Sequence, residues 1–379
     1  MNTFDSILSG ELQALEKADL RRTLRVVDPA LVNFAANDYL GLARHPALIE
    51  AAQEATARLG TGAGASRLVT GTDDAVLALE AELAEWKEKE AALVFSSGFA
   101  AALGTIPALA GKGDTVILDK LSHASLIDAA RLSGATVRTF AHNDVKRLES
   151  VLRKVATDGA RTLIVTESIF SMDGDGAPLL ELVELKEKHG AWLFVDEAHA
   201  TGLCGATGAG RVAEAGLSER VEIVMGTLSK ALGSVGGYVA GSRALVDWLT
   251  NRARSFIYST AMPPGVIAAS HAAVKMARSR EGAKLRARLW GNIARFHAGL
   301  PERWKKHARS TSAIQPLICG EASAALAMAA ALRERGFLIP AIRYPTVARG
   351  SARLRVTLSA GHGEKEIDGL NRALVEFGN

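Results

Sequence analysis

Short runs of apolar residues alternate with amphipathic stretches along the chain from about residue 74. The apolar runs predict strands at 92–96, 115–119, 136–140, 162–167, 191–196, 223–227 and 238–241. The stretches between them predict helices at 74–88, 99–110, 122–132, 144–156 and 179–189. The runs are nearly continuous rather than alternating, which is typical of strands buried on both faces. The pattern therefore predicts an α/β fold whose mostly parallel sheet is covered by helices.

The two ends of the chain have a different pattern. Residues 5–20 predict an amphipathic helix, and a short strand and turn follow near residue 32. After a break at Met262-Pro263-Pro264 a helical region runs to about residue 300, followed by strands 313–319 and 352–358 and helices 322–335 and 364–377. We expect an N-terminal segment over 1–45, a large α/β domain over 46–275 and a smaller α+β domain over 276–379.

Composition excludes several classes of protein. The formal charge is only +4, and the basic clusters lack interleaved aromatic residues, so we expect no nucleic-acid partner. The uncharged stretch 95–111 is shorter than the ~20 apolar residues of a membrane span, and no signal peptide is recognisable at the start. Two cysteines do not make a disulfide framework. We expect a cytoplasmic enzyme with no membrane partner and no metal.

Two polar residues at predicted strand ends suggest a specific cofactor. Lys230 stands among small residues just after strand 223–227, and Asp196 ends strand 191–196. A lysine attacks an aldehyde well in a cramped, partly dry site, and a buried carboxylate can hold a protonated pyridine nitrogen. Together they predict pyridoxal 5'-phosphate (PLP), carried as an imine on Lys230.

Other polar residues follow strands that end at the same edge of the sheet, where ligands of parallel sheets bind. Gly98 and Phe99 open a helix whose N–H groups can hold a phosphate, and Thr227 adds a hydroxyl. His123 follows strand 115–119, and its ring can lie on the pyridine. It can instead be an ordinary first-turn residue, with Ser122 as the helix N-cap.

Three more residues complete this set. Glu167 and Ser171 follow strand 162–167, and His199 follows Asp196 closely enough to reach the phenolic oxygen of the cofactor. A histidine in a loop rich in glycine and alanine is otherwise more often structural. The Asp-Glu-Ala-His string at 196–199 also occurs in helicase-type ATPases, but the phosphate loop that those enzymes need is missing from the sequence.

Two further motifs remain open. The glycines at 60–64 are a weak dinucleotide signal, because they follow no strand and their spacing is wrong; we expect a flexible loop there. Arg355 lies on predicted strand 352–358, where its guanidinium can grip a substrate carboxylate. Arg353 points to the same side, so alternation does not choose between them, and either can be a surface charge.

Several strings resemble the α-oxoamine synthases, a family of fold-type I PLP enzymes, and the likeness runs from Arg21 to Arg355. The strings are Asn-Asp-Tyr-Leu-Gly-Leu at 37–42, Ser-Arg-Leu-Val-Thr-Gly at 66–71, Leu-Ser-His-Ala-Ser at 121–125, Phe-Ala-His-Asn-Asp at 140–144, Phe-Ser-Met-Asp-Gly-Asp at 170–175, Val-Asp-Glu-Ala-His at 195–199 and Ile-Tyr-Ser-Thr at 257–260. The resemblance implies a large PLP-binding domain and a smaller C-terminal domain.

The resemblance also implies a role for each matching residue. Lys230 is the Schiff-base lysine and the base that removes the substrate's α-proton, with Asp196, His123 and His199 as the other catalytic residues. The implied cofactor-binding set is Gly98, Phe99, His123, Ser171, Asp196, His199, Thr227, Lys230 and, from the partner in a homodimer with active sites at the interface, Ser259 or Thr260. The implied substrate-binding set is Arg21, facing the acyl group, with Thr346, and Asn37 and Arg355 on the amino-acid carboxylate.

The implied reaction is a decarboxylating condensation of L-alanine with a pimeloyl thioester of coenzyme A or acyl carrier protein, in biotin biosynthesis. The segment 341–350 departs from the family, because Tyr344 and Ala348 replace two prolines. Sister activities therefore remain alternatives: a glycine C-acetyltransferase, a 5-aminolevulinate synthase or a synthase of acyl-derived signals. A non-catalytic protein of the same fold is disfavoured, since a pure binder has no need of Lys230.

Overall fold

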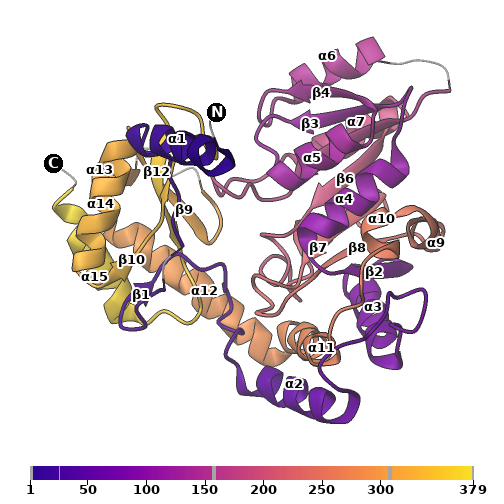
Figure 1. Ribbon diagram of the computed structural model, residues 1–379, viewed down its shortest axis with the longest axis horizontal. Helices are drawn as coiled ribbons and strands as arrows, with labels where there is room; N and C mark the ends of the chain where they lie inside the picture. The colour runs from indigo at the N-terminus through magenta and orange to yellow at the C-terminus, as the bar shows by residue number, and fades with distance from the viewer. Residues whose placement is uncertain (1–2, 25, 156–158, 306–309, 378–379) are drawn as a thin grey trace. The chain divides into compact units, whose positions relative to one another are not determined.

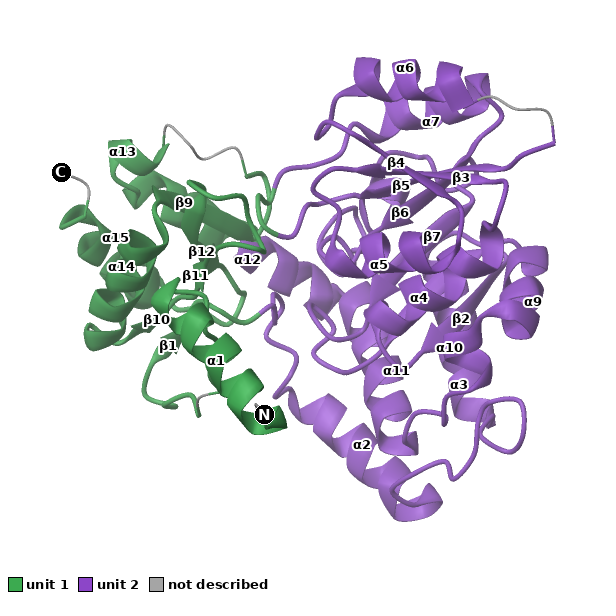
Figure 2. Cartoon of the chain, turned by 45° about the horizontal axis from the view of Figure 1, so that its top comes forward, with its two compact units in different colours: residues 1–36, 172–174, 290–379 green, residues 37–171, 175–289 purple. Residues whose placement is uncertain are grey.

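The computed structural model describes residues 3–24, 26–155, 159–305 and 310–377, and the chain divides into two compact units (Figure 2). Unit 1 comprises residues 1–36, 172–174 and 290–379, and unit 2 comprises residues 37–171 and 175–289. Helix α12 (Arg280–Gly299) carries the chain from unit 2 into unit 1. The domain boundaries that we expected at 45 and 275 remain predictions.

Unit 2 is built on a seven-stranded sheet (Figure 1). In spatial order the strands are β2 (Ala91–Phe95), β8 (Gly237–Gly241), β7 (Ile223–Thr227), β6 (Trp192–Asp196), β5 (Thr162–Glu167), β3 (Thr115–Asp119) and β4 (Thr136–Phe140). Strand β8 runs antiparallel to both of its neighbours, and the other neighbouring pairs are parallel. The predicted fold class, a mostly parallel mixed sheet covered by helices, is confirmed.

Alternation along the strands divides the core of unit 2 between the two faces of the sheet. Leu163 and Val165 belong to one apolar cluster and Ile164 to another, because successive side chains of a strand point to opposite faces. The first cluster includes residues of α4 (Gly98–Leu109), α5 (Ala124–Leu132), α9 (Arg243–Arg252) and α10 (Arg254–Ile257). The second includes residues of α6 (Val145–Val155), α7 (Leu179–Lys188) and α8 (Arg211–Glu214).

The remaining helices of unit 2 are α2 (Pro46–Leu59), α3 (Asp74–Trp86) and α11 (Pro264–Arg278). The sequence pattern did not lead us to expect α2. A signal for it exists, because His45 caps the helix and Pro46 occupies its first turn, where proline needs no hydrogen-bonded N–H. No helix of the described ranges is both long and apolar enough to span a bilayer.

Unit 1 contains a three-stranded antiparallel sheet in the order β11 (Ala341–Ile342), β12 (Ala352–Thr357) and β9 (Ile314–Gly320). A two-stranded pair joins β1 (Val32–Asn33) to β10 (Phe337–Leu338). The helices are α1 (Phe4–Lys17), α13 (Glu302–Lys305), α14 (Ala322–Glu334) and α15 (Glu364–Val375). Every residue of β12 is buried, including its two arginines, so neither arginine is the surface charge that the sequence left open.

In unit 2 an imidazole between two carboxylates fastens the loop that follows β5. His142 Nδ1 lies 3.0 Å from Asp119 Oδ1, and His142 Nε2 lies 2.8 Å from Asp175 Oδ2. Burial alone would lower the pKa of His142, but hydrogen bonds to the two carboxylates outweigh it and raise the pKa to about 10. The ring is therefore an imidazolium at neutral pH.

We predict that this imidazolium makes the stability of the protein depend on pH. Because its folded-state pKa lies above the ordinary value of 6.5, its stabilising effect is complete below pH 6.5 and is lost as the pH rises through about 10. The difference in unfolding free energy between the native protein and His142→Asn should therefore shrink steadily over that range, as measured by urea unfolding at fixed pH values. Curves that stay parallel from pH 6.5 to 10 would show that His142 is not charged in the folded state.

Candidate functional site

The carboxyl ends of β2, β3, β5, β6 and β7 bring the polar residues that we singled out to one edge of the sheet in unit 2. The register shows how close they are, because Glu167 at the end of β5 is the direct partner of Asp196 at the end of β6. Ligands of open parallel sheets bind at this edge. It is therefore the candidate site.

Lys230 ends a chain of hydrogen bonds. Its Nζ lies 2.9 Å from His199 Nε2, and His199 Nδ1 lies 2.6 Å from the hydroxyl of Tyr39. Tyr39 in turn donates to Asn37 Oδ1 at 3.1 Å. Only one order gives each of these three contacts a donor and an acceptor, because Asn37 Oδ1 can only accept. Lys230 donates to Nε2, Nδ1–H donates to Tyr39, and Tyr39 donates to Asn37. This order gives His199 a fixed tautomer and orientation beside the amine.

Tyr39 was not among the predicted site residues. It lies in the string at 37–42 on which the family resemblance rested, but we gave it no role. The sequence offered a weak signal, since a tyrosine that becomes fully buried normally needs a partner for its hydroxyl.

Two buried carboxylates lie side by side under the amine. Asp196 accepts from the N–H of Ala198 at 2.8 Å, and burial raises its pKa to about 6 against the opposing charge of Lys230. Glu167 accepts from the N–H of His123 at 2.6 Å and of Ser171 at 3.2 Å. Burial, and then the charge of Asp196, raises the pKa of Glu167 to about 8. Such strongly shifted groups in a confined place are typical of functional sites.

Glu167 thus joins two predicted site residues that lie on different loops. The sequence placed Glu167 at a strand end but predicted no role for it. Its carboxylate holds the backbone of His123, at the start of α5, and that of Ser171, on the loop after β5. Ser171 itself is buried.

His123 caps its own helix. Its Nδ1 accepts from the N–H of Ser125 at 3.2 Å, so the alternative interpretation, in which Ser122 is the N-cap, is wrong. The hydroxyl of Ser122 is buried without a partner among the described residues. Although His123 reaches the surface, partial burial lowers its pKa, and the charge of Lys230 lowers it further. A neutral ring is therefore favoured at this position.

The start of α4 has free backbone N–H groups of the kind that bind anions. The hydroxyl of Ser97 accepts from the N–H of Ala100 at 3.0 Å, and the N–H groups of Gly98 and Phe99 lie in the first turn, where a helix offers them no internal acceptor. Thr227 borders this turn, since a Cβ on Gly98 would lie 3.8 Å from Thr227 Oγ1. Gly237 borders it too, and has no room for a side chain, because a Cβ there would lie 2.5 Å from the nitrogen of Gly98.

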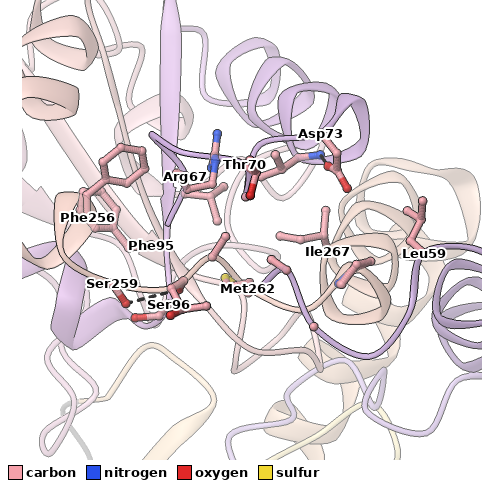
Figure 3. Close-up of a pocket in the computed structure, with 18 of the residues that line it drawn as sticks. Leu59, Arg67, Thr70, Asp73, Phe95, Ser96, Phe256, Ser259, Met262 and Ile267 are labelled. Carbon is pink, nitrogen blue, oxygen red and sulfur yellow. Dashed lines mark hydrogen bonds between the residues drawn. The ribbon is translucent and has the colours of Figure 1, made fainter. Parts of the chain in front are cut away.

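Ser259 and Thr260 line a separate pocket of unit 2, together with Arg67, Thr70 and Ser96 (Figure 3). Thr260 forms an isolated bridge with Ser66, and the N–H of Ala261 donates to the carbonyl of Ala65 at 2.9 Å. The loop that contains Gly60 to Gly64 is therefore tied down at its far end, beyond the glycines. Thr260 remains exposed.

The predicted substrate residues Arg21, Thr346 and Arg355 belong to unit 1. Arg353 forms an ion pair with Asp173 at 2.7 Å, whereas Arg355 donates to the hydroxyl of Thr357 at 3.0 Å. The structure thus distinguishes two arginines that strand alternation did not. Asn37 lies in unit 2 with Lys230.

Arg21 and Thr346 line one pocket of unit 1, together with two arginines that the sequence analysis did not select. Arg22 donates to the hydroxyl of Thr346 at 3.2 Å, and Arg343 donates to the carbonyl of Arg21 at 2.9 Å. Arg21 also pairs with Glu16 at 2.6 Å. The pocket is therefore predominantly cationic, with carboxylates at Glu16 and Asp19.

The groups of unit 2 fit PLP chemically. An amine, a buried carboxylate, an anion-binding helix start and a neutral imidazole lie at the ends of neighbouring strands. Lys230 would bind the aldehyde carbon, Asp196 the ring nitrogen, and Gly98, Phe99 and Thr227 the phosphate. Within the described residues no group of His, Cys, Asp and Glu side chains is arranged to hold a metal ion.

Comparisons with known proteins agree with this chemistry. The profile of the family described as aminotransferase class I and II matches residues 29–374. A protein of Anaeromyxobacter dehalogenans named 8-amino-7-oxononanoate synthase is 47% identical over 379 residues, covering 97% of this chain and 94% of the relative.

Two solved structures are also similar. A serine palmitoyltransferase from S. paucimobilis with bound PLP–myriocin aldimine has a TM-score of 0.89 at 30% identity, covering 98% of this chain and 97% of that one. An 8-amino-7-oxononanoate synthase from Francisella tularensis has a TM-score of 0.77 at 29% identity, covering 92% of this chain and 98% of that one.

We predict that the hydroxyl of Thr227 contributes to phosphate binding. Thr227→Val should weaken PLP binding by about tenfold or more, the effect of losing a hydrogen bond to a charged group. Thr105→Val controls for the loss of a buried hydroxyl from α4 that has no partner among the described residues, whereas the hydroxyl of Thr227 also donates to the carbonyl of Gly236 at 2.8 Å. Absorbance titration of both variants with PLP measures the effect. Equal affinities would remove Thr227 from the phosphate site.

Proposed function

We propose that this chain, which belongs to the aminotransferase class I and II family and to the 8-amino-7-oxononanoate synthases within it, condenses L-alanine with a pimeloyl thioester. The products are 8-amino-7-oxononanoate, carbon dioxide and the free thiol of coenzyme A or acyl carrier protein. The reaction is the acyl-transfer step of biotin biosynthesis, and its cofactor is PLP.

The observation that carries this proposal is the amine of Lys230, held 2.9 Å from His199 beside the buried carboxylates of Asp196 and Glu167. PLP, when bound, supplies an electron sink that stabilises negative charge on the α-carbon of the amino acid. Asp196 would hold the ring nitrogen of PLP in its protonated form through a charge-assisted hydrogen bond, and His123 would lie against the ring.

Lys230 is the group that moves the α-proton. It acts as a base only when its amine is neutral, and the accepting nitrogen of His199 provides a place for the proton of the ammonium form. The hydrogen bonds from His199 through Tyr39 to Asn37 keep the imidazole aligned for this exchange.

We propose Arg355 and Asn37 as the groups that bind the carboxylate of alanine. Arg353 is already committed to the carboxylate of Asp173 and to the carbonyl of Met172, at 2.7 and 3.2 Å. Arg355 donates to the hydroxyl of Thr357 at 3.0 Å and stands on the same buried strand, where a guanidinium can hold a carboxylate through two parallel hydrogen bonds.

We propose the cationic pocket of unit 1 as the site for the acyl group. Pimelate is a dicarboxylic acid, so its thioester retains a free carboxylate at the far end, which suits Arg22 and Arg343 in this pocket, whereas Arg21 is already paired with Glu16. A plain fatty acyl chain has nothing to offer these groups. Tyr344, one of the two departures from the family pattern, lies against the guanidinium of Arg349 with 4.3 Å from the ring centre to Cζ.

The test is the reaction itself. PLP-loaded protein should convert L-alanine and pimeloyl-CoA to 8-amino-7-oxononanoate, detected by mass spectrometry, with one carbon dioxide released per product. Glycine, acetyl-CoA and palmitoyl-CoA should be poor replacements. Lys230→Ala should lower the rate by at least about a hundredfold, because a positioned general base contributes that much or more.

Two further results decide between the alternatives. Arg355→Lys should raise the KM for alanine with little change in PLP binding, since the lysine keeps the charge but not the two-pronged grip. Faster turnover with glycine, or with a short or uncharged acyl thioester, would assign the protein to a sister activity. Absence of any condensation by PLP-loaded protein would overturn the proposed function.

We also propose a homodimer with active sites at the interface. Large apolar side chains are exposed close in sequence to residues that line the pocket of Ser259 and Thr260. They are Leu68, Val69, Phe99 and Tyr258, with exposed fractions of 45 to 74%. Exposed apolar groups in one place are typical of interaction surfaces, and a twofold dimer is the commonest assembly. Ser259 or Thr260 would then reach the phosphate of the partner.

Val69→Arg should therefore shift the protein from dimer to monomer in sedimentation experiments at micromolar concentration. The matched control is Leu132→Arg, because Leu132 is similarly exposed but lies at the end of α5. A native protein that sediments as a monomer, or a Val69→Arg variant as dimeric as the control, would contradict the proposed interface.

The two cysteines, both free thiols, support a reducing compartment such as the cytoplasm.

A further inference from the structure

A buried ammonium group lies behind the turn that presents Asp196 and His199. Lys87, at the C-cap of α3, is only 2% exposed. Its Nζ lies 2.9 Å from Glu197 Oε2 and 3.0 Å from the hydroxyl of Thr201, and it also donates to the carbonyl of Ala209. The lysine and its partners all belong to unit 2. None of them has a role in the chemistry proposed above.

The partners of Lys87 fix the turn from both of its ends. Glu197 directly follows Asp196, and its second carboxylate oxygen accepts from the N–H of Val212 at 2.8 Å. The carbonyl of Glu197 accepts from the N–H groups of Ala200 and Thr201 at 2.9 and 2.8 Å, which closes the turn around His199. One ammonium therefore holds the residue after Asp196 and the residue two positions after His199.

The same cluster reaches the strand that precedes Lys230. The hydroxyl of Thr201 lies 2.8 Å from that of Tyr238, and the ring of Tyr238 lies under the Lys87 ammonium at 5.6 Å. Tyr238 pairs with Gly226, directly before Thr227, and a Cβ on Gly226 would collide with the tyrosine hydroxyl. The ends of β6 and β7 are thus braced by one set of contacts.

Stability alone does not explain a charged pair at this place. Burial would lower the pKa of Lys87, but the carboxylate of Glu197 outweighs it and keeps the pKa above its ordinary value, so the ammonium stays charged. An apolar replacement of a buried ion pair is often as stable as the pair. The pair adds geometric specificity, because its directional hydrogen bonds permit only one arrangement of the turn.

We infer that Lys87 is a positioning residue for the cofactor site, acting through Glu197 and Thr201 to hold Asp196 and His199 in place. The inference rests on the proposed function only in requiring that this site binds PLP. It does not depend on which amino acid or acyl thioester reacts.

The chain offers a matched control at the opposite end of the same strands. Lys186, on α7, is 7% exposed and pairs with Glu222 at 2.5 Å, and the other oxygen of Glu222 accepts from the N–H of Leu193 at the start of β6. This pair also fixes β6 and the approach to β7, but at their amino ends, away from the candidate site.

The experiment compares Lys87→Met with Lys186→Met in the full chain. Both substitutions remove a buried charge, and both should lower the urea concentration at which the apoprotein unfolds. Only Lys87→Met should weaken PLP binding, by about tenfold. Residues that position the coordinating side chains of a metal site change metal affinity by a similar factor when they are mutated. It should also reduce the visible circular dichroism of bound PLP, which reports how firmly the ring is oriented.

A double variant separates misplacement from instability. Lys87→Met combined with Glu197→Gln leaves no unpaired charge, so stability should recover relative to Lys87→Met while PLP binding and its circular dichroism remain impaired. This variant also decides the matter if Lys87→Met alone does not fold.

Two results would overturn the inference. PLP affinity and circular dichroism equal to those of the native protein in either Lys87 variant would make the pair purely structural. An equal loss of PLP binding in Lys186→Met would make the effect a general consequence of instability. A native protein that binds PLP normally but does not condense alanine with pimeloyl-CoA would refute the proposed substrates and leave this inference standing.

Discussion

Two carboxylates that face each other across neighbouring parallel strands are the constraint on which the site depends. Glu167 and Asp196 end β5 and β6 in direct register, and both are buried. Two like charges so confined repel each other, and their burial penalises both. Positive partners offset this penalty. They are the backbone N–H groups of three loops, the ammonium of Lys230 and, on cofactor binding, a protonated ring nitrogen.

This requirement explains why the surrounding loops are so closely tied together. His123 and Ser171 are attached to Glu167 through their own backbones, and Ala198 to Asp196. Side chains that would contact the cofactor therefore project from backbone that the carboxylates hold. The same set of hydrogen bonds therefore has two effects: it stabilises the charges that would face the ligand, and it fixes the geometry of the surrounding loops.

Most of the sheet and the main site residues could be predicted because the signals are local. Continuous apolar runs marked the strands of unit 2, and parallel topology brings their carboxyl ends together without any knowledge of side-chain contacts. Tyr39 and Lys87 escaped prediction because their partners are distant in the sequence: Lys87 lies 110 residues from Glu197, and Tyr39 lies 160 residues from His199. Arg353 and Arg355 share one strand and one parity, so only their partners distinguish them.

The antiparallel strand β8 has a consequence for how this protein can change. Because it runs against its neighbours, its first residue, Gly237, pairs with both Phe95 at the end of β2 and Thr227 at the end of β7. One position without a side chain therefore separates the turn at Gly98, where we expect the phosphate, from the strand that leads to Lys230. The turn at Gly98 and the end of β7 cannot be changed independently at this point, because a side chain at Gly237 would collide with the backbone of Gly98, while Gly237 itself pairs with Thr227. Changes in substrate preference have more freedom in the pocket of unit 1 that we propose for the acyl group, where Arg21, Arg22 and Thr346 are exposed.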